Sequence, residues 1–176
     1  MTQTIQQRDR LAADTAMGPV TLDVADLDGM TAYYRDAVTL QVLSEEGPVV
    51  TLGRGSTPII VLRHSPELKH AAPGSAGLFH TAILVPTQAD LAATLASMAQ
   101  ARARYVGSAD HLVSKAFYFE DPEGNGIELY WDRERTEWSW VHGQVEMDNK
   151  FLDADTFLRE HLTEDGLKTP DDSDAE

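Results

Sequence analysis

The segment from Ala109 to Asp132, ADHLVSKAFYFEDPEGNGIELYWD, constrains the fold more than any other part of the sequence. Two apolar halves flank the turn DPEGN (residues 121–125), in which proline fixes φ and glycine accepts the left-handed conformation. This pattern predicts a β-hairpin with strands over Ser114–Glu120 and Gly126–Trp131. As turn residues, Asp121 and Glu123 are expected to face solvent.

A similar order of elements occurs twice along the chain. In the first part, an alternating strand (Pro19–Val24) precedes a helix (Met30–Val38), which Asp28 is expected to cap, and short strands up to Leu62 follow. In the second part, a strand at Leu78–Val85 precedes an Ala- and Leu-rich helix, and the hairpin closes the unit. One such unit is too small for a good core. The repeat therefore predicts an α+β fold of two βαβββ modules, which form a curved mixed sheet around a cleft.

Changes in composition suggest how the chain is divided. A segment with two prolines and two glycines separates the repeats, and the last six residues are mostly acidic. The predicted parts are an N-terminal arm (1–16), a first module (17–64), a linker (65–77), a second module (78–132), a packing extension with a short helix (133–164) and an acidic disordered tail (165–176).

The composition limits the functions that the chain can have. Cysteine is absent, which excludes disulfides, thiolate metal sites and thiol nucleophiles. The net charge of −15 argues against non-specific nucleic-acid binding through phosphate neutralisation. No apolar run approaches the roughly 18–20 residues of a membrane span, and the start lacks the apolar region of a secretory signal. We therefore expect a cytoplasmic protein that binds neither nucleic acid nor membrane.

Residues able to hold a metal through nitrogen and oxygen lie on the predicted strands of the second unit. His80 stands at the entry of an apolar strand, and Glu128 alternates with the apolar residues on either side of it. Tyr118 lies an even number of positions before Glu128 across the predicted hairpin, so both are expected on one face. His111 precedes the hairpin in a predicted loop, and its imidazole can exchange protons near neutral pH.

Each of these four residues also has an interpretation without a catalytic role. A strand-end histidine can be satisfied by a backbone group, and a tyrosine such as Tyr118 can belong to the core. Glu128 and His111 can simply be solvated. A carboxylate on a concave sheet face, however, needs a cation or a hydrogen-bond partner.

Three pieces of the sequence resemble the vicinal-oxygen-chelate superfamily, which includes glyoxalase I, bleomycin-resistance proteins and extradiol ring-cleaving dioxygenases. They are VTLDVADL (20–27) followed by YYRD (33–36), FHTAIL (79–84), and FYFEDPEGNGIELY (117–130). Residues 132–148 further resemble the first half of the four-module catechol 2,3-dioxygenase type, so the chain is similar to a half-length relative.

The resemblance implies βαβββ modules around a divalent metal, with His80 and Glu128 as ligands. The metal expected first is Fe(II), with Mn, Zn or Ni as alternatives. The matching positions of the first module are Pro19 and, near the closing strand, Val61, neither of which can bind a metal through its side chain. A third ligand would come from His111, His64 or another subunit.

The function implied by the resemblance is extradiol-type ring cleavage of a small vicinal diol such as a catechol, with His111 and Tyr118 moving protons. Two alternatives remain open: a non-catalytic module that binds or sequesters a small molecule, favoured by Pro19 and Val61, and a glyoxalase-type isomerase or lyase. Self-association into a homo-oligomer is expected, because two further modules would normally cover the exposed edges.

Overall fold

The first half of the chain folds into a four-stranded mixed sheet. The computed structural model describes residues 11–12, 14–70, 72 and 74–164; the predicted acidic tail and residues 1–10 and 13 of the predicted arm lie outside this part. The strands are β1 (Val20–Val24), β2 (Gln41–Glu46), β3 (Val49–Arg54) and β4 (Thr57–His64). Their order is β1-β4-β3-β2, with β1 parallel to β4 and the other pairs antiparallel.

The second half repeats this arrangement. Its strands are β5 (Thr81–Leu84), β6 (Arg104–Asp110), β7 (Ser114–Glu120) and β8 (Gly126–Asp132). Their order is β5-β8-β7-β6, and β5 pairs in parallel with β8. The predicted α+β class of two strand–helix–three-strand units is therefore confirmed, whereas the limits of the predicted domains stay a prediction.

Each unit carries one helix between its first and second strands. Helix α1 (Leu27–Ala32) continues into a π-helical turn, η2 (Tyr33–Ala37). Its N-cap is Asp26, whose carboxylate accepts from the Gly29 amide at 3.0 Å. The predicted cap, Asp28, was wrong by two residues and lies in the first turn.

Helix α2 (Gln88–Gln100) begins at a capping box. The Thr87 hydroxyl accepts from the Asp90 amide, and the Asp90 carboxylate accepts from the Thr87 amide, which satisfies two amides that the first turn leaves unpaired. Leu91, Leu95 and Met98 form its buried stripe.

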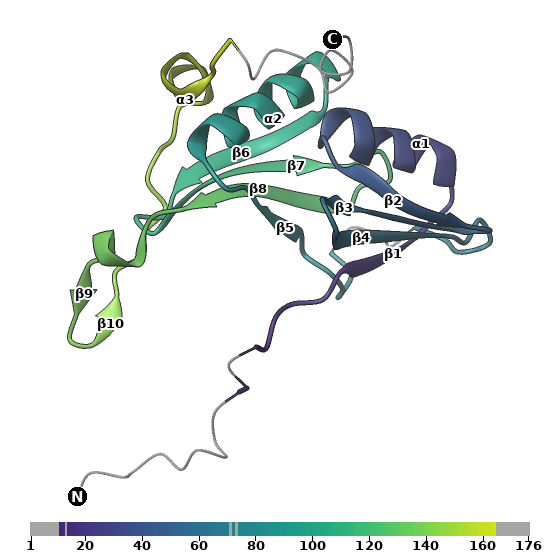
Figure 1. Ribbon diagram of the computed structural model, residues 1–176, viewed down its shortest axis with the longest axis horizontal. Helices are drawn as coiled ribbons and strands as arrows, with labels where there is room; N and C mark the ends of the chain where they lie inside the picture. The colour runs from purple at the N-terminus through teal and green to yellow at the C-terminus, as the bar shows by residue number, and fades with distance from the viewer. Residues whose placement is uncertain (1–10, 13, 71, 73, 165–176) are drawn as a thin grey trace, which may run out of the picture.

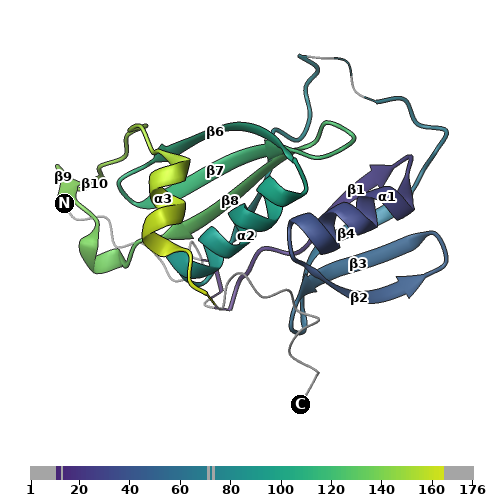
Figure 2. The same cartoon turned by 90° about the horizontal axis from the view of Figure 1, so that it is seen from above.

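Helices α1 and α2 lie on the same side of the two sheets, and the sheets stand side by side (Figures 1 and 2). The apolar residues that alternate toward the helices are almost fully buried and form one cluster with residues from both units. Examples from the central strands are Leu52, Ile60, Leu62, Phe117, Ile127 and Leu129. Among the described residues, no helix covers the opposite face of either sheet (Figure 1), so side chains that alternate out of the core face that side.

The residues after β8 form an extension. It contains a short 3-10 turn, η3 (Arg135–Glu137), a two-stranded hairpin of β9 (Trp140–Val141) and β10 (Gln144–Val145), and helix α3 (Ala154–His161). The hairpin projects from the body, whereas α3 lies beside α2 over the second sheet (Figures 1 and 2). Phe157 of α3 is buried, and its ring centroid lies 5.0 Å from that of Phe117.

The turn between β7 and β8 joins the two units, and the expectation that its carboxylates face solvent was wrong. Asp121 is 4% exposed and accepts from the Tyr34 hydroxyl of η2 at 3.0 Å. Glu123 accepts from the amides of Ala25 and Asp26, both at 2.8 Å, just before α1. Turn residues were expected to be solvated, but here the turn docks on the N-terminal end of a helix, where amides need acceptors.

No helix in the described part of the chain is long and apolar enough to cross a membrane.

Candidate active site

The parallel pairing of β5 with β8 brings His80 next to Glu128. In this register Thr81 lies opposite Ile127 and Ala82 lies opposite Glu128, and His80 immediately precedes the strand. Because Ile127 points into the core, Glu128 projects from the face without helices. Its Oε2 atom lies 2.8 Å from Nε2 of His80, and the side chains are only 13% and 28% exposed.

Gly126 allows this close approach. A Cβ atom on Gly126 would lie 2.4 Å from the carbonyl oxygen of Phe79 and 3.0 Å from Cβ of His80. Backbone contacts of this kind cannot relax by a rotation of the neighbouring side chain, so any larger residue would push the segment before β5 away from β8. The centroid of the Phe79 ring lies 4.9 Å from the centroid of the His80 ring.

Tyr118 stands directly opposite Glu128 in the antiparallel pair of β7 and β8. Its hydroxyl donates to Oε1 of Glu128 at 3.1 Å, so the two carboxylate oxygens have different partners. Partial burial raises the pKa of Tyr118 to about 12, and the charge of Glu128 and the hydrogen bond to it add to this effect. Tyr118 is therefore a neutral hydrogen-bond donor at physiological pH.

His111 occupies the turn between β6 and β7. Its Nε2 atom lies 2.8 Å from the Tyr118 hydroxyl, and its Nδ1 atom lies 3.1 Å from the carbonyl oxygen of Asp148. The four site residues predicted from the sequence therefore form one continuous run of close polar contacts, His80–Glu128–Tyr118–His111.

The first unit has the same register without the same side chains. Thr21 lies opposite Val61 on β1 and β4, as Ala82 lies opposite Glu128 on β5 and β8. Val61 thus stands where the second unit has Glu128, and Pro19, two residues before Thr21, stands where the second unit has His80. At these equivalent positions the second unit therefore has a His–carboxylate pair, and the first unit has none.

The donor atoms of His80 and Glu128 suit a divalent cation. Metal–ligand bonds to imidazole nitrogen and carboxylate oxygen are about 2.0–2.2 Å, so two such donors at right angles to each other lie about 3 Å apart. The observed separation of 2.8 Å fits such a pair. In the part of the chain that the structure describes, no group of three or more His, Asp or Glu side chains could hold a metal. Neither His111 nor His64 therefore completes a three-ligand set.

A cavity of about 330 Å³ lies beside this site, at the junction of the two units. Phe79 and Gly126 line it together with Lys69 and His70 of the connecting segment. None of the four site residues lines this cavity. The position of the candidate active site therefore rests on the contacts among the four side chains.

Two features of the site were not expected from the sequence. The Asp148 carbonyl, which contacts His111, lies in the extension, and no local pattern marks a backbone acceptor that acts across 37 positions. Gly126 was assigned to the predicted strand, and the close approach of residues 79–80 is a tertiary feature.

Comparison with known proteins agrees with this architecture. The model of a family described as the Glyoxalase/Bleomycin resistance protein/Dioxygenase superfamily matches residues 16–129. The curated catechol-2,3-dioxygenase of Bacillus subtilis (strain 168) is 31% identical over 163 residues. The match covers 91% of this chain and 57% of that protein, so the chain spans little more than half the length of this relative.

Solved structures show the same fold at low sequence identity. A glyoxalase/dioxygenase from Nostoc punctiforme has a TM-score of 0.58 at 17% identity, covering 70% of this chain and 100% of that one. Lactoylglutathione lyase from Agrobacterium tumefaciens has a TM-score of 0.53 at 19% identity (68% and 96%). A fosfomycin resistance protein from Listeria monocytogenes has a TM-score of 0.53 at 14% identity (70% and 97%). These likenesses concern the fold alone.

Proposed function

Because the chain belongs to the Glyoxalase/Bleomycin resistance protein/Dioxygenase superfamily, we propose that it is a metal-dependent, ring-cleaving dioxygenase of the extradiol kind. The proposed substrate class is a small vicinal diol such as a catechol. The observation that carries the proposal is the run of close polar contacts from His80 through Glu128 and Tyr118 to His111. It joins a nitrogen–oxygen donor pair to two groups that can move protons.

The proposed metal is Fe(II), held by Nε2 of His80 and a carboxylate oxygen of Glu128, with Mn, Zn and Ni as alternatives of similar ligand preference. When bound, the metal would act as a Lewis acid and as a template for a chelating diol. Two protein ligands leave several coordination positions for other donors, which favours a substrate with two adjacent oxygens. Iron kept in the ferrous state suits the reducing cytoplasm, which we propose as the location.

The protein's own residues would then serve the two hydroxyl groups of the substrate. Tyr118 is protonated at neutral pH, as its ordinary pKa of 10 already implies, and burial raises the pKa of its phenol further, to about 12; it can therefore donate a hydrogen bond to a developing oxyanion. His111 reaches the site through the Tyr118 hydroxyl, and an imidazole can both accept and return a proton. The short side chain of Ala82, opposite Glu128, leaves room on this face.

Oxygen uptake tests this proposal. The full chain would be purified anaerobically, loaded with Fe(II) and mixed with catechol in an oxygen-electrode cell, while absorbance follows the ring-opened product. We expect one oxygen consumed per catechol cleaved, and loss of both signals in His80→Asn. The matched control is His142→Asn: His142 lies in the exposed β9–β10 turn at φ 51°, a conformation that Asn tolerates. An iron-loaded protein that cleaves no vicinal diol would overturn the proposal.

A second candidate function is a binding module that sequesters a small molecule without turnover. Pro19 and Val61 favour it, because the first unit adds no ligand to the pair in the second. Tight binding of catechols without oxygen uptake in the iron-loaded protein would support this function. Conversion of a hemithioacetal without oxygen uptake would instead support glyoxalase-type chemistry.

The proposed partners are this small-molecule substrate and a second copy of the chain. Apolar side chains such as Leu84 (50% exposed) and Phe79 (85% exposed) stand beside the site, and a second copy would cover such surface. Sedimentation at several protein concentrations would measure this association directly, and a monomer at all concentrations would contradict it.

A further inference from the structure

A short segment of the extension, Glu146–Lys150, lies along the end of β6; we call it the strap. The amides and carbonyls of Lys150 and Asp110 form a reciprocal antiparallel pair, with both N···O distances at 3.0 Å. Two residues earlier, the Asp148 amide donates to the His111 carbonyl at 3.4 Å, and the Asp148 carbonyl faces Nδ1 of His111 at 3.1 Å. The strap therefore contacts both the backbone and the imidazole of His111.

The backbone of His111 is also fixed from the side of the turn. Its amide donates to the Ser114 carbonyl at 2.9 Å. The next residue, Leu112, has a φ of 69°, an uncommon conformation for a bulky residue, and its amide donates to Oδ1 of Asp110 at 2.8 Å. Arg133 donates to the other oxygen of Asp110 at 2.7 Å. These bonds hold the turn in one conformation, so the orientation of the imidazole depends on its two ring contacts.

The partners of the two ring nitrogens determine which nitrogen carries the proton. A backbone carbonyl can only accept a hydrogen bond, so the contact with Asp148 requires a proton on Nδ1. In the neutral imidazole, Nε2 then has a free lone pair directed at the Tyr118 hydroxyl, which can donate to it. The opposite tautomer would place two lone pairs against each other at the Asp148 contact.

The phenol proton of Tyr118 consequently has two acceptors within reach. Nε2 of His111 lies at 2.8 Å and Oε1 of Glu128 lies at 3.1 Å from the same oxygen. A single hydroxyl proton can turn from one acceptor to the other without movement of any heavier atom. This arrangement suits proton relay only if Nε2 presents its lone pair, which is the property that the strap sets.

We propose that the strap is a positioning element: the carbonyl of Asp148 fixes the Nδ1–H tautomer of His111 and so makes Nε2 the proton acceptor at the end of the run. The catalytic role of the strap rests on the proposed function, whereas the tautomer of His111 does not depend on that function. The extension thus has a second role besides the packing that the sequence predicts, and the positioning residues are Asp148 and Lys150.

Nitrogen NMR of the full chain tests the inference without metal or substrate. Two-bond proton–nitrogen correlation spectra of protein labelled with ¹⁵N-histidine distinguish the tautomers, and His111→Asn assigns the signal. We expect neutral His111 to carry its proton on Nδ1. A neutral His111 with its proton on Nε2 in the wild-type protein overturns the proposal, whether or not any variant folds.

A pair of variants separates the strap from the side chain of Lys150. Lys150→Pro removes the amide that donates to Asp110, whereas Lys150→Ala keeps it. We expect mixed tautomers of His111 in Lys150→Pro only, and unprotected exchange of the Asp110 amide in that variant. If the Asp110 amide exchanges without protection in Lys150→Pro but the tautomer of His111 is unchanged, the strap does not determine that tautomer.

Activity then distinguishes the two proposals. In a protein that cleaves catechol, we expect Lys150→Pro to lower kcat about 10- to 100-fold, as for other residues that orient a functional side chain, while Lys150→Ala keeps it. An inactive protein with His111 protonated on Nδ1 would contradict the proposed function and leave the strap intact. An active protein whose His111 carries the proton on Nε2 would support the proposed function and contradict the proposed role of the strap.

Discussion

Nε2 of His80 and Oε2 of Glu128 lie 2.8 Å apart because β5 and β8 pair in parallel within the second unit. The same pairing in the first unit joins β1 to β4 and brings no such pair together, since Val61 occupies the position of the carboxylate. The two units thus share a backbone arrangement and differ in the side chains that chemistry needs. The candidate site belongs to the second unit and to the extension that follows it.

Gly126→Ala should separate His80 from Glu128. The added Cβ would lie 2.4 Å from the Phe79 carbonyl oxygen, so the segment before β5 has to move. We expect a loss of about 1–3 kcal/mol in the free energy of unfolding, typical of overpacking, together with weaker binding of divalent metal. Chemical denaturation and metal titration measure the two effects.

The control for this variant is Gly107→Ala on β6, where a Cβ atom meets no heavy atom within 4 Å. We expect Gly107→Ala to change the free energy of unfolding by no more than about 0.5 kcal/mol and to leave metal binding unchanged. Equal effects in the two variants would show that the contact of Gly126 with the Phe79 backbone does not position His80.

Tyr118 should remain protonated until strongly alkaline pH. Burial is the largest cause of its raised pKa of about 12, followed by the charge of Glu128. Ultraviolet difference titration of the wild type against Tyr118→Phe should therefore show no ionisation of this phenol near pH 10. In Glu128→Gln the pKa should fall toward, but stay above, 10, because burial remains.

The raised pKa also predicts how Tyr118 affects stability. Between its ordinary pKa of 10 and its folded pKa of about 12, the folded state binds more protons than the unfolded state. The contribution of Tyr118 is therefore fully present below pH 10 and is lost as pH rises toward 12. Stability that falls equally in Tyr118→Phe over this range would contradict the assignment.

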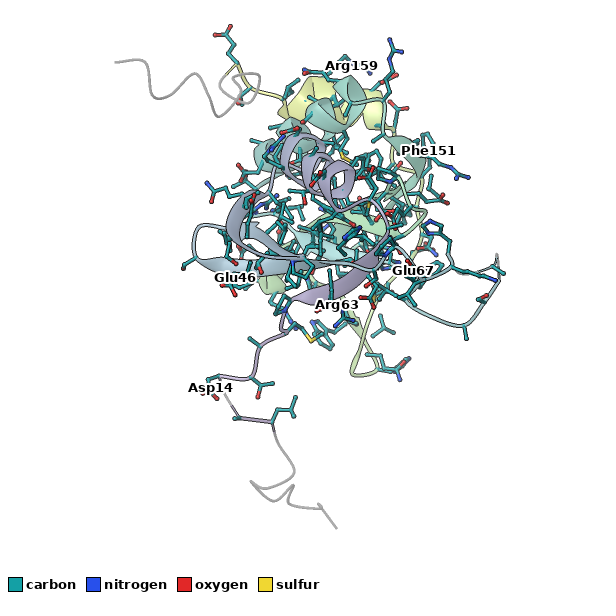
Figure 3. All side chains as sticks on the ribbon, turned by 90° about the vertical axis from the view of Figure 1, so that its right-hand side faces the viewer. Asp14, Glu46, Arg63, Glu67, Phe151 and Arg159 are labelled. Atoms are coloured by element: carbon teal, nitrogen blue, oxygen red, sulfur yellow. The ribbon has the colours of Figure 1, made fainter. Side chains whose placement is uncertain are left out.

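Glu123 should matter for the junction of the two units. Its side chain is 9% exposed, and its Oε1 atom accepts from the amides of Ala25 and Asp26. In Glu123→Ala both amides lose this acceptor, which should lower the free energy of unfolding by about 1–3 kcal/mol. Glu46, at the periphery of the first sheet, provides the matched control (Figure 3).

Thermal or denaturant unfolding of Glu123→Ala and Glu46→Ala measures this difference. The surface variant should change stability by no more than about 0.5 kcal/mol. If Glu123→Ala is as stable as Glu46→Ala, the contact of Glu123 with the first unit does not contribute to the free energy of unfolding.

Local patterns in the sequence were sufficient to predict the repeated units and the sheet face of two site residues, Glu128 and Tyr118. Alternation around Glu128 placed it opposite the buried Ile127 and Leu129, and the even spacing to Tyr118 placed both on one face, as the register shows. These properties follow from the period of a strand, which any short window of sequence contains.

Contacts between distant segments could not be predicted in the same way. The turn residues Asp121 and Glu123 were expected in solvent because their composition is that of an exposed turn, but docking against the first unit overrides this preference. The contact of the Asp148 carbonyl with His111 depends on the path of the extension. A backbone acceptor leaves no mark in the identity of its residue.

Metal binding tests the cation site between His80 and Glu128. Protein prepared anaerobically would be dialysed against Fe(II), and bound iron would be measured in the wild type, His80→Asn, Glu128→Gln and the control His142→Asn. We expect one iron per chain in the wild type and the control, with binding lost in both site variants. Iron bound equally by all four proteins, or by none of them, would contradict a cation site between His80 and Glu128.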